Sequence, residues 1–291
     1  MKTLKIIEKT KIWFIISLSI MILGLVFVIK DGLNYGIEFK GGTLVQINMN
    51  KEFDKGDVEK ILKKYTNDYT TNEARDNNNN IQLEIRSNSL KDDQIKPMFN
   101  EIKAKYKLQD KDLLAQQRIG PSVGKELRSK AILSLIIANI AMLVYVGFRF
   151  EFKFGLAAIL ALVHDILITI SVYAILQIPV NSSFIAAILT IVGYSINDTI
   201  VVFDRIRENR KRNRKANEAE VANVSITQTM KRSINTSLTT LFTIVCVYIF
   251  VPSVREFALP LLIGIVCGAY SSIFIASPLW VVFTKKDKIL N

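Results

Sequence analysis

Long apolar runs alternate with short charged segments along this chain. Six runs are 18–27 residues long, and at about 1.5 Å per residue each can cross a hydrocarbon core about 30 Å thick as a helix. They are Ile12–Ile29, Ala131–Phe148, Phe154–Leu176, Phe184–Phe203, Ser233–Val251 and Phe257–Phe283. The fifth is the weakest, because it opens with a polar stretch and is fully apolar only from about Leu241. The pattern predicts an α-helical membrane protein with six transmembrane helices.

Residues 30–130 form one long polar block, in which short segments have the apolar spacing of strands and helices typical of an α+β domain. Apolar residues at every second position predict strands, and apolar residues at helical spacing predict helices. In chain order we expect a strand at Thr43–Met49, a helix at Asp57–Tyr65 capped by Asp54 or Asp57, a weak strand near Tyr69–Ala74, a strand at Ile81–Arg86, a helix over Ser89–Lys105 and a strand at Asp112–Ile119. This β-α-β-β-α-β order is typical of a ferredoxin-like domain.

The chain is therefore expected to divide into four regions. They are residues 1–29, with the first transmembrane helix, the α+β domain of residues 30–130, transmembrane helices 2–6 in residues 131–283, and a tail of residues 284–291. Lysines precede the first apolar run and no small-x-small cleavage site follows it, so we expect an uncleaved anchor.

The composition agrees with this segregation. Half of the 291 residues are hydrophobic, yet the net charge is +12. The polar block carries 19 basic and 16 acidic residues, and most of the remaining positive charge flanks the apolar runs. Basic flanks are typical of cytoplasmic loops, so we do not expect nucleic-acid binding, and the apolar content excludes a disordered chain.

The same charges predict the orientation. With the N-terminus inside, the inside segments hold 18 Lys and Arg residues, whereas the short outside loops hold only Arg255. Cytoplasmic loops carry the excess of Lys and Arg. We therefore expect both termini in the cytoplasm and residues 30–130 outside.

The sequence offers no set of residues for catalysis, so an enzyme is not expected. The two cysteines lie in apolar runs, and one histidine cannot make a multi-histidine metal site. The glycine-rich stretch Gly36–Thr43 has Gly42 where a phosphate loop needs lysine, and Gly120–Lys125 is one residue short of that motif. We expect Gly41 and Gly42 instead to permit unusual backbone angles where the chain enters the first strand.

Ionisable residues inside the apolar runs are the candidate functional groups, because each costs about 2.5–3.5 kcal/mol at the centre of a span. Asp198 lies in the fourth run, with Asn197 beside it and Tyr194 one turn away on the same face. Two interpretations stay open. Asp198 either reaches towards the interface and accepts hydrogen bonds from neighbouring hydroxyls, or it carries protons.

The fifth run begins with a polar stripe at helical spacing, formed by Thr229, Arg232, Thr236, Thr240 and Thr243. Hydroxyls in a membrane can bond across helices or hold water. Arg232 is the natural counter-ion of Asp198, and the alternative is an interfacial arginine that follows the charge bias.

Two further groups have structural alternatives. His164 and Asp165 in the third run are either a hydrogen-bonded pair that ties helices together or part of a proton relay. A serine-protease site of His164 with Ser195 is disfavoured, because the G-x-S-x-G turn is missing. The small residues of the last run are expected to allow close helix packing; they are Gly264, Gly268 and Ser272.

Five stretches resemble the SecF subunits of the SecD/SecF protein-export family. They are Gly36–Thr43, Arg149–Phe152, Leu162–Thr169, Gly193–Asn209 and Gly268–Ala276. One departure is Glu38, which stands where the family usually has aspartate.

The resemblance implies one half of an RND-type transporter in the bacterial cytoplasmic membrane. Such a subunit forms a heterodimer with SecD beside SecYEG, with YajC as a further partner, in contact with membrane lipid and with unfolded proteins in transit. The proton motive force would drive export, with H⁺ as coupling ion, Na⁺ as the alternative and no other cofactor. Asp198 and Arg232 match the family's proton-pathway residues, and a deprotonated Asp198 is expected to pair with Arg232.

Two other functions are kept beside this one. In the first, the chain is a purely structural half-transporter subunit whose membrane charges only fix helix packing and SecD binding. In the second, the same architecture exports small molecules or lipids.

Overall fold

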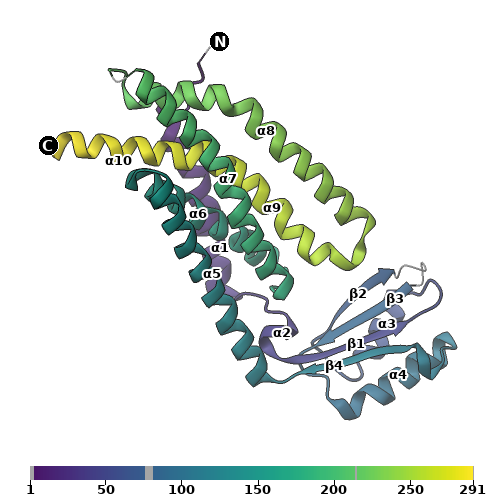
Figure 1. Ribbon diagram of the computed structural model, residues 1–291. Coiled ribbons are helices and arrows are strands. Elements are labelled where there is room, and N and C mark those ends of the chain that lie inside the picture. Colours follow the sequence, from purple (N-terminus) through teal and green to yellow (C-terminus); the bar gives the residue numbers. More distant parts are fainter. Residues whose placement is uncertain (1–2, 76–80, 214, 291) are drawn as a thin grey trace.

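The structure is a computed structural model that describes residues 3–75, 81–213 and 215–290. A bundle of long helices occupies one end and an α+β domain the other (Figure 1). Both termini lie at the end of the bundle far from this domain (Figure 1). The two termini therefore lie on the same side of the helical bundle.

Six segments in the described part of the chain are long and apolar enough to span a membrane, as the apolar runs predict. Seven helices build them: α1 (Thr10–Lys30), α5 (Pro121–Arg149), α6 (Phe152–Ile175), α7 (Ser182–Arg212), α8 (Glu218–Phe250), α9 (Arg255–Ser271) and α10 (Ser277–Leu290). A π-helical segment, Ser272–Ala276, joins α9 to α10. The last two helices therefore form one span.

Two helices begin well before their apolar runs. α5 starts at Pro121 rather than near residue 131, and α8 starts at Glu218 rather than at 233. Each has a favourable beginning: proline suits the first position of a helix, and Asn217 accepts a hydrogen bond from the Ala219 backbone N–H. The apolar run marks only the part at membrane depth, so the expected domain limit at residue 130 falls inside α5.

The α+β domain has the predicted order of elements. Its strands are β1 (Gly42–Asn48), β2 (Thr70–Arg75), β3 (Ile81–Ser87) and β4 (Leu113–Ile119), and its helices are α3 (Lys55–Leu62) and α4 (Asp92–Tyr106). The sheet order is β2-β3-β1-β4 and all pairs are antiparallel. This topology confirms the ferredoxin-like prediction.

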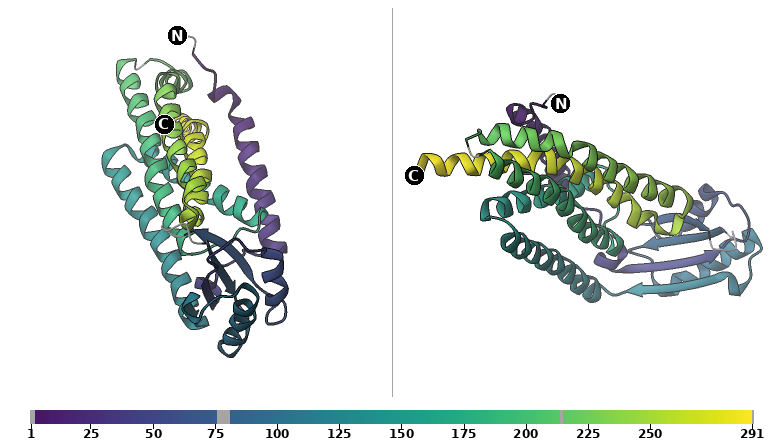
Figure 2. Two further views of the ribbon diagram at one scale, coloured as in Figure 1. Left: turned by 90° about the vertical axis from the view of Figure 1, so that its right-hand side faces the viewer. Right: turned by 45° about the horizontal axis from the view of Figure 1, so that its top comes forward.

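The two faces of this sheet have different roles. Alternate residues such as Val45, Ile47 and Ile85 are buried in one core with α3 and α4. Residues of the other face, including Gln46 and Arg86, line a cavity shared with the end of the bundle nearest this domain. The helix-free face of the sheet is thus turned towards the membrane helices (Figure 2).

The chain enters β1 through a short helix, α2 (Ile37–Lys40), followed by the two glycines. Gly41 has φ +83° and Gly42 has φ +154°. A Cβ atom on Gly42 would lie 2.7 Å from the Ser87 carbonyl oxygen. Both the backbone angles and the close strand contact therefore require glycine here, as expected.

A set of polar contacts, here called the outer junction, joins the α+β domain to the bundle. It consists of Arg86, Asn181 and Glu256. Arg86 on β3 lies 2.6 Å from one carboxylate oxygen of Glu256 at the start of α9, and Asn181, the N-cap of α7, donates to the other oxygen at 2.5 Å. Glu84 also pairs with Arg86, at 2.9 Å. Burial of Arg86 lowers the pKa of its guanidinium, but the carboxylates of Glu84 and Glu256 raise it, so that this pKa lies above its usual value.

Candidate intramembrane site

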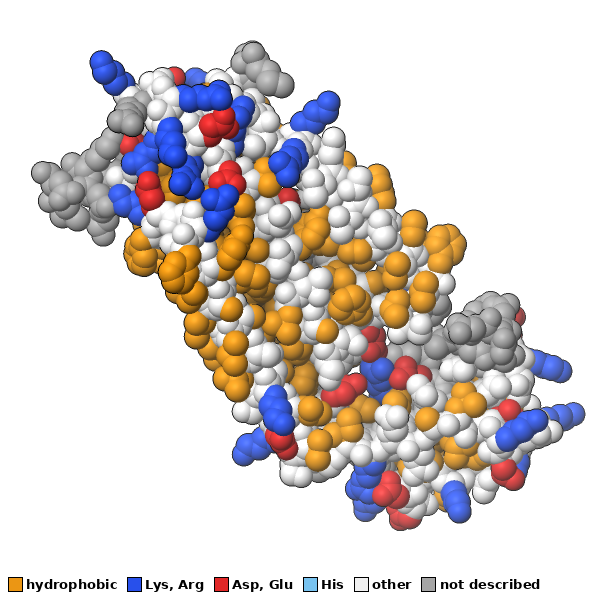
Figure 3. Space-filling view, viewed as in Figure 1, with side chains coloured by type: hydrophobic (Ala, Val, Ile, Leu, Met, Phe, Trp, Pro, Cys, Tyr) orange, Lys and Arg blue, Asp and Glu red, His pale blue; other side chains and the backbone are white. Residues whose placement is uncertain are grey.

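α6, α7 and the α9–α10 span form the interior of the bundle. About half of the apolar stretch of each is buried, against about a tenth in α1, α5 and α8. On the face shown in Figure 3, apolar side chains cover much of the bundle, and its largest group of Lys and Arg side chains lies at the end that carries the termini. Two polar clusters lie in this interior, on adjacent faces of α7.

Asp198 is the centre of the first cluster. Its side chain is buried, with 3% of the residue exposed. The Ser237 hydroxyl on α8 donates to Asp198 Oδ2 over 3.3 Å. Within the described residues this long bond is its one hydrogen bond, and no ion pair reaches it. Asp198 is therefore a sparsely bonded carboxylate in an apolar interior.

The structure does not form the expected Asp198–Arg232 ion pair. Arg232 is exposed and lines a shallow pocket with Asp204 and Glu208 at the end of the bundle that carries the termini. The cause is helical position: Arg232 precedes Ser237, the residue that faces Asp198, by five residues, or about 7.5 Å along α8.

Tyr194 and the polar stripe of α8 do meet. The Tyr194 hydroxyl lies 2.8 Å from Thr240 Oγ1 and 3.0 Å from the Thr236 carbonyl oxygen. The stripe hydroxyls otherwise bond to carbonyl groups of their own helix, as Thr236 does to Arg232. Asn197 lies on an exposed face of α7, outside this cluster. Tyr194 and Ser237 thus supply hydrogen bonds between α7 and α8 at membrane depth, and Asn209 adds bonds to Ser225 and Gln228 nearer the termini.

Asp165 is the centre of the second cluster and is fully buried. Ser195 on α7 and Ser271 at the end of α9 donate to its Oδ2 at 2.6 and 2.8 Å. His164 Nδ1 lies 3.0 Å from its Oδ1, and His164 Nε2 lies 2.8 Å from the Ser17 hydroxyl on α1. With the proton on Nδ1, the histidine donates to Asp165 and accepts from Ser17. The His164–Asp165 pair of α6 thereby connects to three other helices: Asp165 to α7 and α9, and His164 to α1.

This network favours the structural interpretation of the His164–Asp165 pair and argues against the hydrolase one. Ser195 and His164 contact different oxygens of the same carboxylate, and the described residues include no hydrogen bond between the two. A nucleophilic serine needs its base within hydrogen-bond reach. Ser17, Ser195 and Ser271 are absent from the predicted site because an isolated serine in an apolar run carries no periodic signal.

The small residues of the last span pack α9 against α7, as expected. A Cβ atom on Gly264 would lie 2.1 Å from Ile191 Cδ1, and one on Gly268 would lie 3.0 Å from Ser195 Cβ. Ser272, where the π-helical segment begins, lies 2.8 Å from the Thr199 hydroxyl, oxygen to oxygen. Gly24, which the sequence does not single out, plays the same part between α1 and Ser171 of α6.

Comparisons with known proteins agree with this architecture. The family model for the C-terminal part of the protein export membrane proteins SecD and SecF matches residues 99–286, and that for the SecD/SecF GG motif matches residues 26–52. The chain is 40% identical over 279 residues to protein translocase subunit SecF of Calditerrivibrio nitroreducens, which covers 93% of this chain and 91% of that protein.

Longer relatives contain the same region. The chain is 35% identical to protein translocase subunit SecDF of Bacillus subtilis, with 96% of this chain and 38% of that protein covered. The crystal structure of SecDF from Thermus thermophilus, described as a translocon-associated membrane protein, superposes with a TM-score of 0.82 at 33% identity. The match covers 98% of this chain but only 39% of the solved chain. These similarities place the chain in the SecD/SecF family of protein-export membrane proteins.

Proposed function

We propose that this chain acts with SecD as a transport subunit, not an enzyme, that uses the proton motive force to promote protein export. The observation that carries the proposal is Asp198, a buried carboxylate with one long hydrogen bond and no paired cation among the described residues. Such a group can take up and release a proton without breaking a strong ion pair. Ionisable residues inside a membrane commonly mark ion pathways.

We infer the orientation from charge and from the position of the termini. Basic residues gather at the end of the bundle that carries both termini, opposite the α+β domain. By the positive-inside rule this end faces the cytoplasm and the α+β domain lies outside the bacterial cytoplasmic membrane.

The partner proposed for this chain is SecD. The matched SecDF chains are longer, and this chain spans about two fifths of each; a separate SecD would supply the rest. α5 and α8 have few buried positions and expose large apolar side chains such as Ile137, Phe242 and Ile249. SecD and membrane lipid are the expected occupants of these faces. SecYEG, YajC and the unfolded protein in transit are the further partners expected of such a complex.

The proposed coupling starts at Asp198. Protonation from the outer side removes its charge and changes the contact with Ser237, so that α7 moves relative to α8. Asn181 caps the start of α7, and the outer junction links Asn181 through Glu256 to Arg86 of the α+β domain. A displacement of α7 therefore reaches the exported domain through direct contacts. One charge crossing 100 mV supplies about 2.3 kcal/mol, and several protons would bias such a movement.

The test is proton flux and protein export in vesicles that contain this chain with its SecD and SecYEG. Asp198→Asn should abolish the proton-driven step while the complex still assembles. Asp204→Asn, at the cytoplasmic boundary of the same helix, is the matched control and should retain it. Full proton-motive-force-dependent export by Asp198→Asn would refute the proposal, and flux that requires Na⁺ would identify Na⁺ as the coupling ion.

The Asp165 network supports a second candidate, a subunit whose membrane charges serve packing alone. The His164–Asp165 pair of α6 bonds to three other helices. In that case Arg232→Met would weaken the complex with SecD without changing ion conductance. A loss of conductance at unchanged complex stability would favour proton coupling instead.

A further inference from the structure

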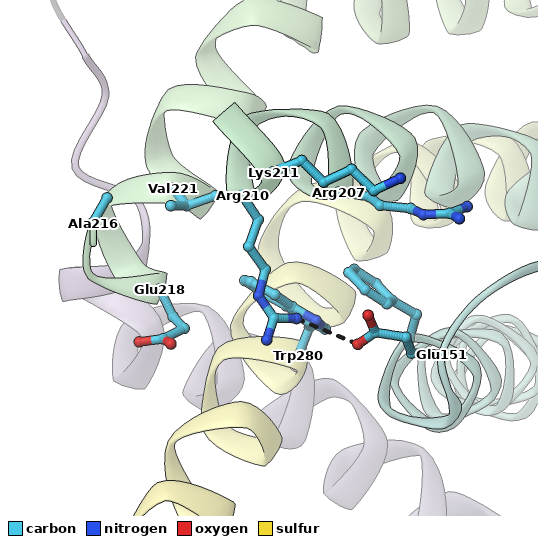
Figure 4. A pocket seen from close by; sticks show the side chains of 9 residues that line it. Glu151, Arg207, Arg210, Lys211, Ala216, Glu218, Val221 and Trp280 are labelled. Atoms are coloured by element: carbon cyan, nitrogen blue, oxygen red, sulfur yellow. Dashed lines mark hydrogen bonds and ion pairs between the residues drawn. The ribbon is translucent and has the colours of Figure 1, made fainter. Parts of the chain in front are cut away.

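A pocket with a volume of about 360 Å³ opens at the end of the bundle that carries the termini. This lies within the range of about 300–1,000 Å³ typical of ligand sites. Its lining includes Arg207, Arg210 and Lys211 from the last turns of α7, Glu151 just before α6, and Trp280 from α10 (Figure 4). α7 and α10 thus bring three cations and an indole ring to one cavity.

The acids of this pocket do not neutralise all of its cations. Arg210 points towards Glu151, with nitrogen and oxygen 3.3 Å apart, and its guanidinium lies 5.9 Å from the centre of the Trp280 ring (Figure 4). Glu218, the second acid of the lining, is largely buried and has an interaction of its own. Arg207 and Lys211 have no hydrogen bond or ion pair to any other described residue. Two of the three cations therefore remain available to an anion.

Trp280 gives a second, independent indication of a ligand. The residue has no exposed surface, and its ring stacks on Phe154 with centroids 5.1 Å apart and planes inclined by 18°. Its Nε1–H is buried and has no acceptor among the described residues. Buried indole N–H groups normally have a partner. The indole N–H of Trp280 is therefore a donor in the lining of this pocket that the described residues leave without an acceptor.

We propose that this pocket binds the phosphodiester headgroup of an anionic phospholipid in the cytoplasmic leaflet. A phosphodiester offers only acceptor oxygens, which suits an N–H donor beside unpaired Arg and Lys side chains. Phe148 and Phe152 flank the adjacent loop with 90% and 75% of their surface exposed, and they offer apolar contact to an acyl chain. This second feature favours a lipid over a soluble phosphate. The pocket faces the cytoplasmic leaflet in the orientation proposed above, and anionic lipids are concentrated in that leaflet.

The experiment is a lipid titration of the purified full-length chain in neutral detergent, followed by native mass spectrometry. The probes are phosphatidylglycerol, phosphatidylcholine and inorganic phosphate. The variants are Arg207→Gln with Lys211→Gln, which removes the free cations, and Trp280→Phe, which removes the N–H but keeps an aromatic ring. Arg212→Gln is the control, because Arg212 carries the same charge on α7 but pairs with Glu208 outside the pocket.

We expect one phosphatidylglycerol to bind in preference to phosphatidylcholine. Both pocket variants should weaken binding about fivefold or more, and Arg212→Gln should not. Equal losses in Arg212→Gln and the double variant would show only general charge attraction and would overturn the proposal, as would native binding by Trp280→Phe. Displacement of the lipid by excess inorganic phosphate would indicate a soluble phosphate site instead. This assay involves no proton gradient, so its failure would leave the proposed function untouched.

Discussion

Asp165→Asn tests whether one buried carboxylate holds the bundle together. The substitution keeps the size of the side chain but replaces one acceptor oxygen with an NH₂ group, which donates. Asp165 accepts from Ser195 and Ser271 at Oδ2 and contacts His164 at Oδ1. The NH₂ group then either faces the two serine hydroxyls, which would have to accept instead of donate, or faces His164, which would have to carry its proton on Nε2 instead of Nδ1.

The magnitude follows from the number of bonds. Hydrogen bonds between helices in a membrane contribute about 0.6 kcal/mol on average and up to about 1.7 kcal/mol. Three bonds to one carboxylate, one of them within α6, therefore correspond to about 2–5 kcal/mol, of which the asparagine retains a part. We expect Asp165→Asn to lower the free energy of unfolding by about 1–3 kcal/mol.

The assay is reversible unfolding of the purified chain in mixed micelles, titrated with a denaturing detergent. Asp198→Asn is the matched control, because it is the same substitution in the same bundle but affects only the 3.3 Å bond from Ser237. Its expected cost is below about 1 kcal/mol. If Asp198→Asn destabilises the bundle as much as Asp165→Asn does, the assignment of separate roles to the two carboxylates is wrong.

Three further predictions concern packing, the outer junction and the α+β domain. Gly264→Leu should destabilise the bundle by about 1–3 kcal/mol in the same assay, because even a Cβ atom would overlap Ile191. Arg86→Gln should increase hydrogen exchange around Glu256 about tenfold, equivalent to about 1.4 kcal/mol, without affecting α4. Hydrogen bonds from one lysine of α4 and one of α3 hold the pKa of Asp57 below its usual range. The stability that ionised Asp57 gives to α3 is therefore fully present above the ordinary aspartate pKa and is lost as the pH falls through the lowered value. Asp57→Asn should remove that pH dependence from hydrogen exchange in α3.

Each of these predictions has its own contrary outcome. Native stability of Gly264→Leu would mean that α9 can move away from α7 without cost. Unchanged exchange at the outer junction in Arg86→Gln would show that the ion pair does not hold the domain to the bundle. An unchanged pH profile in Asp57→Asn would assign the titration to another carboxylate.

The spacing of apolar residues along the chain predicts the secondary structure well, because the spacing typical of a helix or a strand follows from the local geometry of that element. A run of about 20 apolar residues can satisfy its backbone in lipid only as a helix, which accounts for all six spans. Alternation in Thr43–Met49 and Ile81–Arg86 predicts β1 and β3, since one face of each is buried. The limits of α5 and α8 are less predictable, because polar residues continue a helix outside the membrane as readily as apolar residues do within it.

The sequence by itself determined the six spans, the ferredoxin-like domain and the identity of Asp198 as a costly buried charge. Tertiary structure decided which side chains meet. It placed Asp198 opposite Ser237 rather than Arg232, and it brought Ser17, Ser195 and Ser271 to the His164–Asp165 pair. Burial of a charge can be read from its neighbours along the chain, whereas its partners depend on the rotation and depth of other helices. These are set by packing at small residues such as Gly264, which the sequence marks as a close contact without indicating which helix fills it.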